Sequence, residues 1–201
     1  MRLMRRSVPL ALLLLVFAQG NALAATVNVS MTNFVFTPKT ATLTIGGTVH
    51  WMNDTPTTNH TSTGDTPLSL WDSGTVLPGG SFNFVFTAGG KYTYHCTFHQ
   101  GLGMVGTVSV KIKASPPSGP VGTTFTITVG SINAPAGFVY DIQKRNPGGN
   151  FQDWMLGVTT KSVPFDSTGM PSGTYSFRSL LHKTSDNSKS GFSAAKSIMV
   201  T

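Results

Sequence analysis

Glutamate is absent from this sequence of 201 residues, and charged residues of all kinds make up only 10% of it. Leucine is also scarce beyond the amino terminus, whereas threonine, valine, phenylalanine and glycine are frequent. This balance disfavours helices and favours pleated strands joined by turns. We therefore predict an all-β protein.

Clusters of basic residues are missing as well. The whole chain has a formal net charge of +7, but three of its arginines, Arg2, Arg5 and Arg6, lie at the amino terminus. The remainder carries a net charge of about +4, with scattered lysines and no interleaved aromatic residues. This pattern excludes a nucleic-acid groove, so we expect no nucleic acid among the partners.

No apolar run is long enough to cross a bilayer, so we predict no transmembrane segment. The run from Val8 to Phe17 follows the basic residues, and Ala22-Leu23-Ala24-Ala25 supplies a small-residue cleavage pattern. This order is typical of a secretory signal peptide, which we place at residues 1–25. We expect an exported protein, in the periplasm or the extracellular space.

Short alternating runs of apolar residues follow, as in strands with one buried face. They lie at residues 27–31, 49–51, 82–86, 92–96 and 108–112, and again at 125–129, 138–142, 175–177 and 198–200. A stretch rich in proline and small residues, 114–120, interrupts the pattern. We predict a sandwich of antiparallel strands at 26–113, a linker at 114–120 and a second, smaller sandwich at 121–201.

Only one cysteine, Cys96, is present, which excludes an internal disulfide. In an oxidising compartment a lone thiol is liable to oxidation or to pairing between chains, unless something occupies its sulfur. His99 and Met104 follow Cys96 at C-x2-H-x4-M spacing, in a glycine-containing loop that a strand leads into. A thiolate, an imidazole and a thioether can therefore surround one ion, and His60 is the natural donor of a second imidazole.

This set of donors selects among metals. Two imidazoles, a thiolate and a weak thioether suit Cu(I) and Cu(II) about equally. Zinc makes no use of a thioether, while calcium and magnesium need carboxylates, which this segment lacks. We predict one copper ion per chain, bound by His60, Cys96, His99 and Met104.

From Val27 to Lys113 the chain resembles the plastocyanin and amicyanin group of small blue copper proteins, the cupredoxins. The resemblance rests on four stretches: Asn33-Phe34-Val35-Phe36-Thr37-Pro38, Gly47-Thr48-Val49-His50-Trp51, Gly90-Lys91-Tyr92-Thr93-Tyr94 and His99-Gln100-Gly101-Leu102-Gly103-Met104. It implies a Greek-key β-sandwich, a type 1 copper site with the same four ligands, and single-electron transfer. One departure is Thr61, because relatives often have there an asparagine that braces the ligand loop.

The second sandwich loosely resembles fibronectin type III or immunoglobulin-like domains, in the run Gly173 to Arg178 and in the serine-rich stretch before the last strand. Its histidine, His182, has no second ligand type near it in sequence, so we interpret it as a surface or structural residue. We interpret this part of the chain as a spacer, or as a module that docks to a partner or to the cell envelope.

The leading hypothesis is an electron carrier and not an enzyme. A redox partner protein would contact an apolar surface around His99, formed by Phe98, Gly101, Leu102 and Gly103. One alternative is a delivery protein whose copper is cargo. Another alternative is an enzyme resembling the copper nitrite reductases, in which His95 binds a second copper. Strand alternation speaks against this role, because it turns His95 away from Cys96. It likewise turns His50 away from the core.

Overall fold

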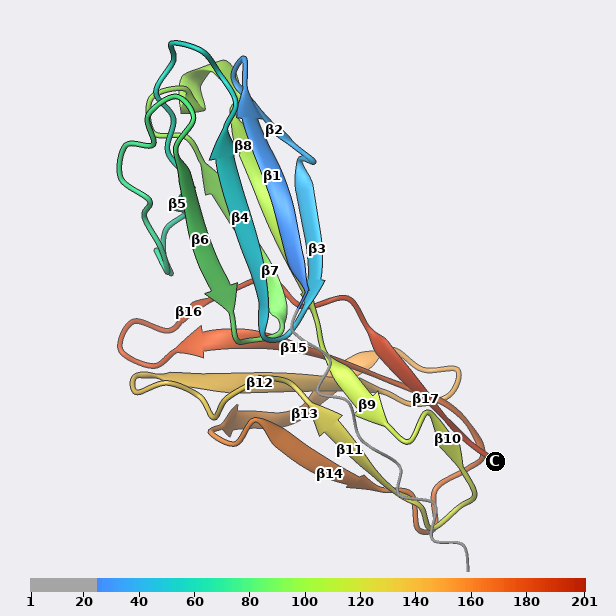
Figure 1. The fold of residues 1–201 in the computed structure, drawn as a ribbon. Helices are drawn as coiled ribbons and strands as arrows, with labels where there is room; N and C mark the ends of the chain where they lie inside the picture. The colour runs from blue at the N-terminus through green and yellow to red at the C-terminus, as the bar shows by residue number, and fades with distance from the viewer. Residues whose placement is uncertain (1–24) are drawn as a thin grey trace, which may run out of the picture.

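Strands dominate the computed structural model, which describes residues 25–201 (Figure 1). Apart from strands, these residues form one short 3-10 helix, η1 (Gln100–Leu102). The prediction of an all-β protein is confirmed. Among the described residues, no helix has the length and apolarity needed to cross a membrane. The predicted signal peptide, residues 1–25, lies outside the described part except for its last residue.

Two sheets of four strands form the N-terminal half, with the orders β2-β1-β4-β6 and β3-β8-β7-β5. The strands are β1 (Thr26–Thr32), β2 (Val35–Thr37), β3 (Thr40–Thr44), β4 (Gly47–Asn53), β5 (Thr63–Gly64), β6 (Ser81–Phe86), β7 (Gly90–His95) and β8 (Val105–Lys111). β1 runs parallel to β4, and β3 runs parallel to β8. The predicted sandwich is present, and these two pairs depart from its otherwise antiparallel pairing because the chain crosses between the two sheets before each of them forms.

Alternating apolar residues build the core of this half. Val49 and Trp51 of β4 and Tyr92 and Tyr94 of β7 are buried, as their spacing predicts. The ring of Trp51 lies 5.5 Å from that of Tyr94 and 5.8 Å from that of Trp71. This aromatic core fixes the two strands that lead to the predicted ligands, since β4 precedes the loop to His60 and β7 ends directly before Cys96.

Two further sheets form the C-terminal half, with the orders β10-β17-β15-β12-β13, where β16 also pairs with β15, and β14-β11-β9. The strands are β9 (Lys113–Ser115), β10 (Ser118–Gly119), β11 (Thr124–Thr128), β12 (Phe138–Arg145), β13 (Phe151–Val158), β14 (Ser162–Asp166), β15 (Gly173–Lys183), β16 (Ser188–Lys189) and β17 (Lys196–Val200). The predicted likeness of this half to immunoglobulin or fibronectin domains stays a prediction.

The segment 114–120, which we expected to be a linker, takes part in the C-terminal sheets. β9 pairs with β11, and β10 pairs with β17. Pro116 and Pro117 lie between these two short strands, where a missing N–H interrupts no ladder. The segment therefore joins the two halves closely, and the exact domain boundaries stay a prediction.

The two halves meet at the end of the first sandwich that lies farthest from η1 (Figure 1). Isolated bridges pair Ala88 with Gly130 and Lys91 with Gly191. Between them, the N–H of Gly89 donates to the carbonyl of Val129 at 2.8 Å. A Cβ atom at Gly89 would lie 2.3 Å from a methyl group of Ile112, so only glycine permits this approach. One hydrophobic core runs through both halves.

His182 belongs to a polar cluster in the C-terminal half, as a structural residue. The buried carboxylate of Asp141 accepts hydrogen bonds from His182 at 2.9 Å, from Lys189 at 3.1 Å and from the N–H of Gly157 at 3.0 Å. Burial raises the pKa of Asp141, but the Gly157 hydrogen bond and the neighbouring cations outweigh it, so the pKa is lowered. The carboxylate is therefore ionised in the folded protein.

Candidate metal centre

Three of the predicted ligands come from two loops at one end of the first sandwich. Cys96 directly follows β7, and His99 precedes η1. His60 lies in the loop after β4, where it and Val76 exchange backbone hydrogen bonds of 3.2 and 2.8 Å. Residues 36 positions apart in the chain therefore meet because β4 and β7 lie in the two facing sheets.

The side chains of His60, Cys96 and His99 point at a common centre. Their nitrogen and sulfur atoms all lie within 4.8 Å of one another. The Cys96 Sγ atom is 3.7 Å from Nδ1 of His60 and 3.4 Å from Nδ1 of His99. One ion with bonds of about 2.0–2.3 Å would hold such atoms roughly 3.5 Å apart. The observed spacing therefore fits a shared metal ion.

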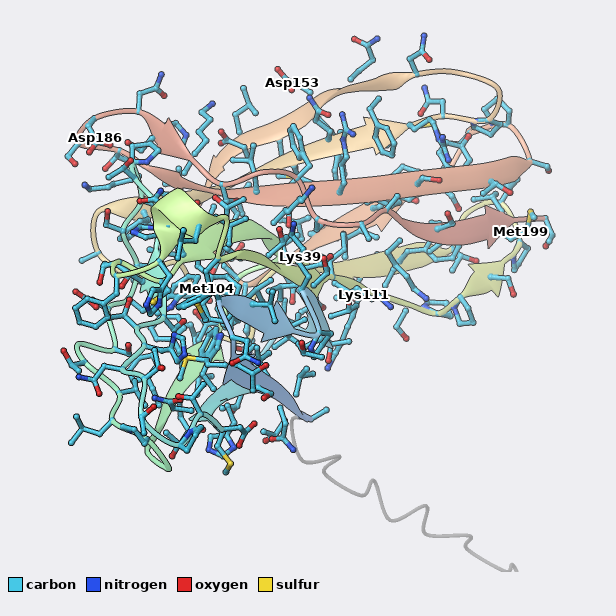
Figure 2. The ribbon with its side chains drawn as sticks, turned by 90° about the horizontal axis from the view of Figure 1, so that it is seen from above. Lys39, Met104, Lys111, Asp153, Asp186 and Met199 are labelled. Carbon is cyan, nitrogen blue, oxygen red and sulfur yellow. The ribbon has the colours of Figure 1, made fainter. Side chains whose placement is uncertain are left out.

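Met104 closes the same loop. Its carbonyl accepts from the N–H of Cys96 at 3.1 Å, and its own N–H donates to the carbonyl of His99 at 3.2 Å. Its side chain is fully buried, in the first sandwich (Figure 2). Gly103, with φ of +84°, makes the tight return that brings Met104 back to Cys96. The thioether thus comes from the same short loop as the thiolate and the second imidazole.

Thr61 braces the two ligand loops against each other. Its N–H donates to Cys96 Sγ at 3.3 Å, and its Oγ1 atom accepts from the N–H of Thr97 at 2.8 Å. The hydrogen bond fixes the position of the sulfur atom beside the two imidazoles. Thr61 therefore braces the ligand loops at the position where relatives often have an asparagine.

Asn53, at the end of β4, holds the loop that carries His60. Its Nδ2 donates to the carbonyls of Thr58 and Val76, both at 2.8 Å, while its Oδ1 accepts from the N–H and hydroxyl of Thr55 at 3.1 and 2.6 Å. Asn53 is fully buried, and all four of its hydrogen-bonding positions are used. Sequence reasoning missed this residue, because its partners are mostly backbone atoms.

The protonation state of His60 suits metal binding. Burial, followed by the charge of nearby His99, lowers the pKa of His60 below its ordinary value of 6.5. Its imidazole is therefore neutral near pH 7, as a metal ligand must be. Its Nε2 atom is buried without a hydrogen-bond partner in the described part of the chain, while Nδ1 faces the sulfur.

The surface next to His99 is apolar. His99 is half-buried, whereas Cys96, His60 and Met104 are fully buried. The predicted surface residues Phe98, Gly101, Leu102 and Gly103 are all exposed, with exposed fractions of 53% for Phe98 and 65% for Leu102. His99 is therefore the most exposed of the four ligands, and exposed apolar residues lie beside it.

Phe34 adds to this surface and was missed from the sequence. Its ring, 40% exposed, lies 4.5 Å from the ring of His99. Phe34 has a φ of +66°, which is rare for a bulky residue, and its neighbour Asn33 also has a positive φ. The sequence of the run Asn33 to Pro38 gave no sign of this turn, because a left-handed backbone breaks the strand alternation.

His95 and His50 do not join the centre. Nδ1 of His95 lies 2.6 Å from Asp65, and Nδ1 of His50 lies 3.3 Å from the amide oxygen of Asn28. Across residues 25–201, the cluster of His60, Cys96 and His99 is the single group of such side chains spaced to hold a metal. The prediction that His95 and His50 face away from the core ligands agrees with these contacts.

Comparisons with known proteins support this geometry. Residues 23–111 match the family described as copper binding proteins, plastocyanin/azurin family. A plastocyanin from Scenedesmus fuscus is 31% identical over 85 residues, which cover 38% of this chain and 87% of that relative. The chain belongs to the plastocyanin/azurin family. As predicted, it is a cupredoxin, with further β-sheets after the matched region, and His60, Cys96, His99 and Met104 form a type 1 copper site.

Solved cupredoxins are also similar to part of this chain. A reduced Cu(I) form of an amicyanin mutant at pH 4 shares 22% identity at a TM-score of 0.40, covering 47% of this chain and 90% of that one. A purple cupredoxin from Nitrosopumilus maritimus shares 27% identity at a TM-score of 0.38, covering 43% of this chain and 99% of that one. Both alignments cover less than half of this chain.

Proposed function

We propose that this cupredoxin is an exported electron carrier, which passes single electrons to and from a redox partner protein through His99. The observation that carries the proposal is the difference in exposure among the ligands. Three are fully buried, and only His99 reaches the surface, where Phe34, Phe98 and Leu102 surround it. His99 therefore gives an electron a short path between the copper site and the surface, at a place where another protein can approach.

The ligands are held rigidly by bonds that do not depend on the metal. Thr61 ties the His60 loop to Cys96 and Thr97, and Asn53 fixes the start of the same loop. Copper in such a site takes up and releases one electron, and a fixed set of ligands that suits both oxidation states keeps the accompanying rearrangement small. These contacts support fast exchange, and they disfavour a delivery protein, whose ligands must open to release the ion.

The predicted export of the protein agrees with the same function. The amino-terminal pattern of basic residues, an apolar run and small residues is typical of a secretory signal. The single thiol of the chain is buried in the metal centre, where bound copper shields it from oxidation outside the cytoplasm. The C-terminal half contacts the end of the cupredoxin farthest from η1, so it leaves the surface around His99 open while it docks to a partner or to the envelope.

The test is the visible absorption and paramagnetic resonance spectrum of the protein loaded with Cu(II), with metal quantitation and Cys96→Ser as the comparison. We expect an intense thiolate-to-copper band at one copper per chain, lost in the variant, and rapid electron self-exchange. A pale spectrum without thiolate character would refute the site. The normal spectrum with slow exchange and ready release of copper to a chelator would instead identify a delivery protein.

A further inference from the structure

Residues 25–201 contain two arginines, Arg145 and Arg178. Both lie on the outer face of the largest C-terminal sheet. The register of β12 with β13 and β15 places six side chains together on it: Gln143, Arg145, Phe151, Asp153, Ser176 and Arg178. The alternate residues Ile142 and Phe177 are buried on the opposite face. We call these six residues the arginine face; Asp153, on the edge strand β13, marks its position in Figure 2.

Arg178 is fixed in place by uncharged neighbours. Its guanidinium carbon lies 4.2 Å from the ring centre of Phe151 and 4.4 Å from that of Phe192. Its Nε and Nη2 atoms donate to Oε1 of Gln143 at 2.9 and 2.7 Å. The group is held by stacking and hydrogen bonds, and its remaining N–H groups have no partner among these contacts.

Arg145 is held beside it in the same way. Its guanidinium carbon lies 5.0 Å from the ring centre of Phe151, and its Nη2 donates to the hydroxyl of Ser176 at 3.1 Å. Within residues 25–201 neither arginine forms an ion pair, and the carboxylate of Asp153 accepts from Nε2 of Gln143 at 2.9 Å instead. Two positive charges thus share one ring without a direct ion pair, since the one carboxylate among the six residues, Asp153, is bonded to Gln143, although the repulsion of the two arginines and their loss of mobility oppose this arrangement.

We propose that the arginine face binds a carboxylate-bearing segment of a partner protein. A guanidinium group can donate two parallel hydrogen bonds to one carboxylate, and a guanidinium that is already immobile loses little entropy on binding. Arginine and aromatic residues are also enriched at the energetic centres of protein interfaces.

Other polyanions fit this face less well. The guanidinium groups already cover Phe151 and Phe192, which leaves little open ring surface for a sugar to stack on. Anionic membranes are recognised by clusters of about four to eight basic residues, and this face has two. An acidic protein segment can be bound by two well-placed guanidinium groups, and it is the occupant that the contacts favour.

The test titrates a fluorescein-labelled hexaglutamate peptide with the full protein at low salt and follows fluorescence anisotropy. Arg145→Gln/Arg178→Gln should weaken binding at least about tenfold, because hydrogen bonds to charged groups are lost. The control Lys113→Gln/Lys161→Gln removes the same charge at two exposed positions near the strands of the other C-terminal sheet, and should change affinity less than about twofold. Circular dichroism checks that each variant is folded.

Arg178→Lys tests whether binding needs the paired hydrogen bonds of a guanidinium or only a positive charge, since lysine keeps the charge and lacks the planar donors. We expect a clear loss of affinity for the peptide. If the double glutamine variant does not fold, Arg145→Lys/Arg178→Lys takes its place with the same expectation. Equal losses in the arginine and control variants, wild-type binding by Arg178→Lys, or no peptide binding would overturn the proposal. So would tighter arginine-dependent binding to a polyuronate or to phosphatidylglycerol vesicles.

Discussion

Replacing Thr61 by valine tests whether its hydroxyl holds the two ligand loops together. Valine keeps the branched shape, and the backbone N–H that donates to Cys96 Sγ is unchanged. The variant removes the acceptor of the Thr97 N–H at 2.8 Å and the contacts with the hydroxyls of Thr63 at 3.1 Å and Thr97 at 3.3 Å. It therefore separates the bracing hydrogen bond from the bond to sulfur.

The expected cost follows from the lost hydrogen bond. A buried N–H left without a partner costs about 1–3 kcal/mol, and the partial exposure of this one places it at the lower end. In a chain of this size each kcal/mol lowers Tm by roughly 2–4 °C. We expect Thr61→Val to lower Tm by about 3 °C, from a cost of about 1 kcal/mol, and to speed loss of copper to a chelator, because the Cys96 loop is less firmly held.

The assay is thermal unfolding by circular dichroism, with and without copper, beside chelator-driven copper release. Thr61→Ser keeps the hydroxyl and is the matched control, which should stay closer to wild type than the valine variant. If Thr61→Val unfolds at the wild-type temperature and releases copper at the wild-type rate, or if serine is as damaging as valine, the bracing role is refuted.

Three other variants test the surface, the acid response and the loop support. Leu102→Lys should slow electron self-exchange about tenfold with an unchanged copper spectrum, because a charge must lose water at the contact, whereas Leu156→Lys on the C-terminal half should not. Asp141 has a folded-state pKa below its unfolded value, so its contribution to stability is present above about pH 4 and is lost as pH falls through the folded-state pKa. The Asp141→Asn variant should therefore lack this part of the acid destabilisation, as measured by thermal unfolding between about pH 7 and 2.5. Asn53→Ala should cost about 3 kcal/mol in the free energy of unfolding, since four hydrogen bonds are lost, three of them buried, against less than about 0.5 kcal/mol for Asn28→Ala at an exposed position.

The metal centre was predictable where its parts are close in sequence. Cys96, His99 and Met104 share one loop, so their spacing alone predicts that their side chains converge. His60 lies 36 residues from Cys96, in a loop after another predicted strand, so spacing alone did not bring it to the centre, and the resemblance to known copper proteins supported its inclusion. The core strands were predictable because Val49, Trp51 and their counterparts alternate with polar residues.

Other features depend on pairing that local sequence does not encode. The segment 114–120 is rich in proline and was expected to be a linker, but β10 within it pairs with β17, which lies some 80 residues later. Phe34 reaches His99 only because two successive residues adopt a positive φ, which asparagine accepts more readily than most residues but phenylalanine rarely adopts. Contacts of this kind come from the assembled fold, and periodicity gives no sign of them.

The close approach at Gly89 makes the two halves of the chain share their stability. Strand bridges and one common core cross the boundary, so neither half can open there without exposing apolar surface of the other. A ligand that binds only the folded state adds its binding free energy to the whole cooperative unit. Copper at one end should therefore slow amide hydrogen exchange in β11 at the other end, and an engineered Gly89→Val should confine that protection to the cupredoxin.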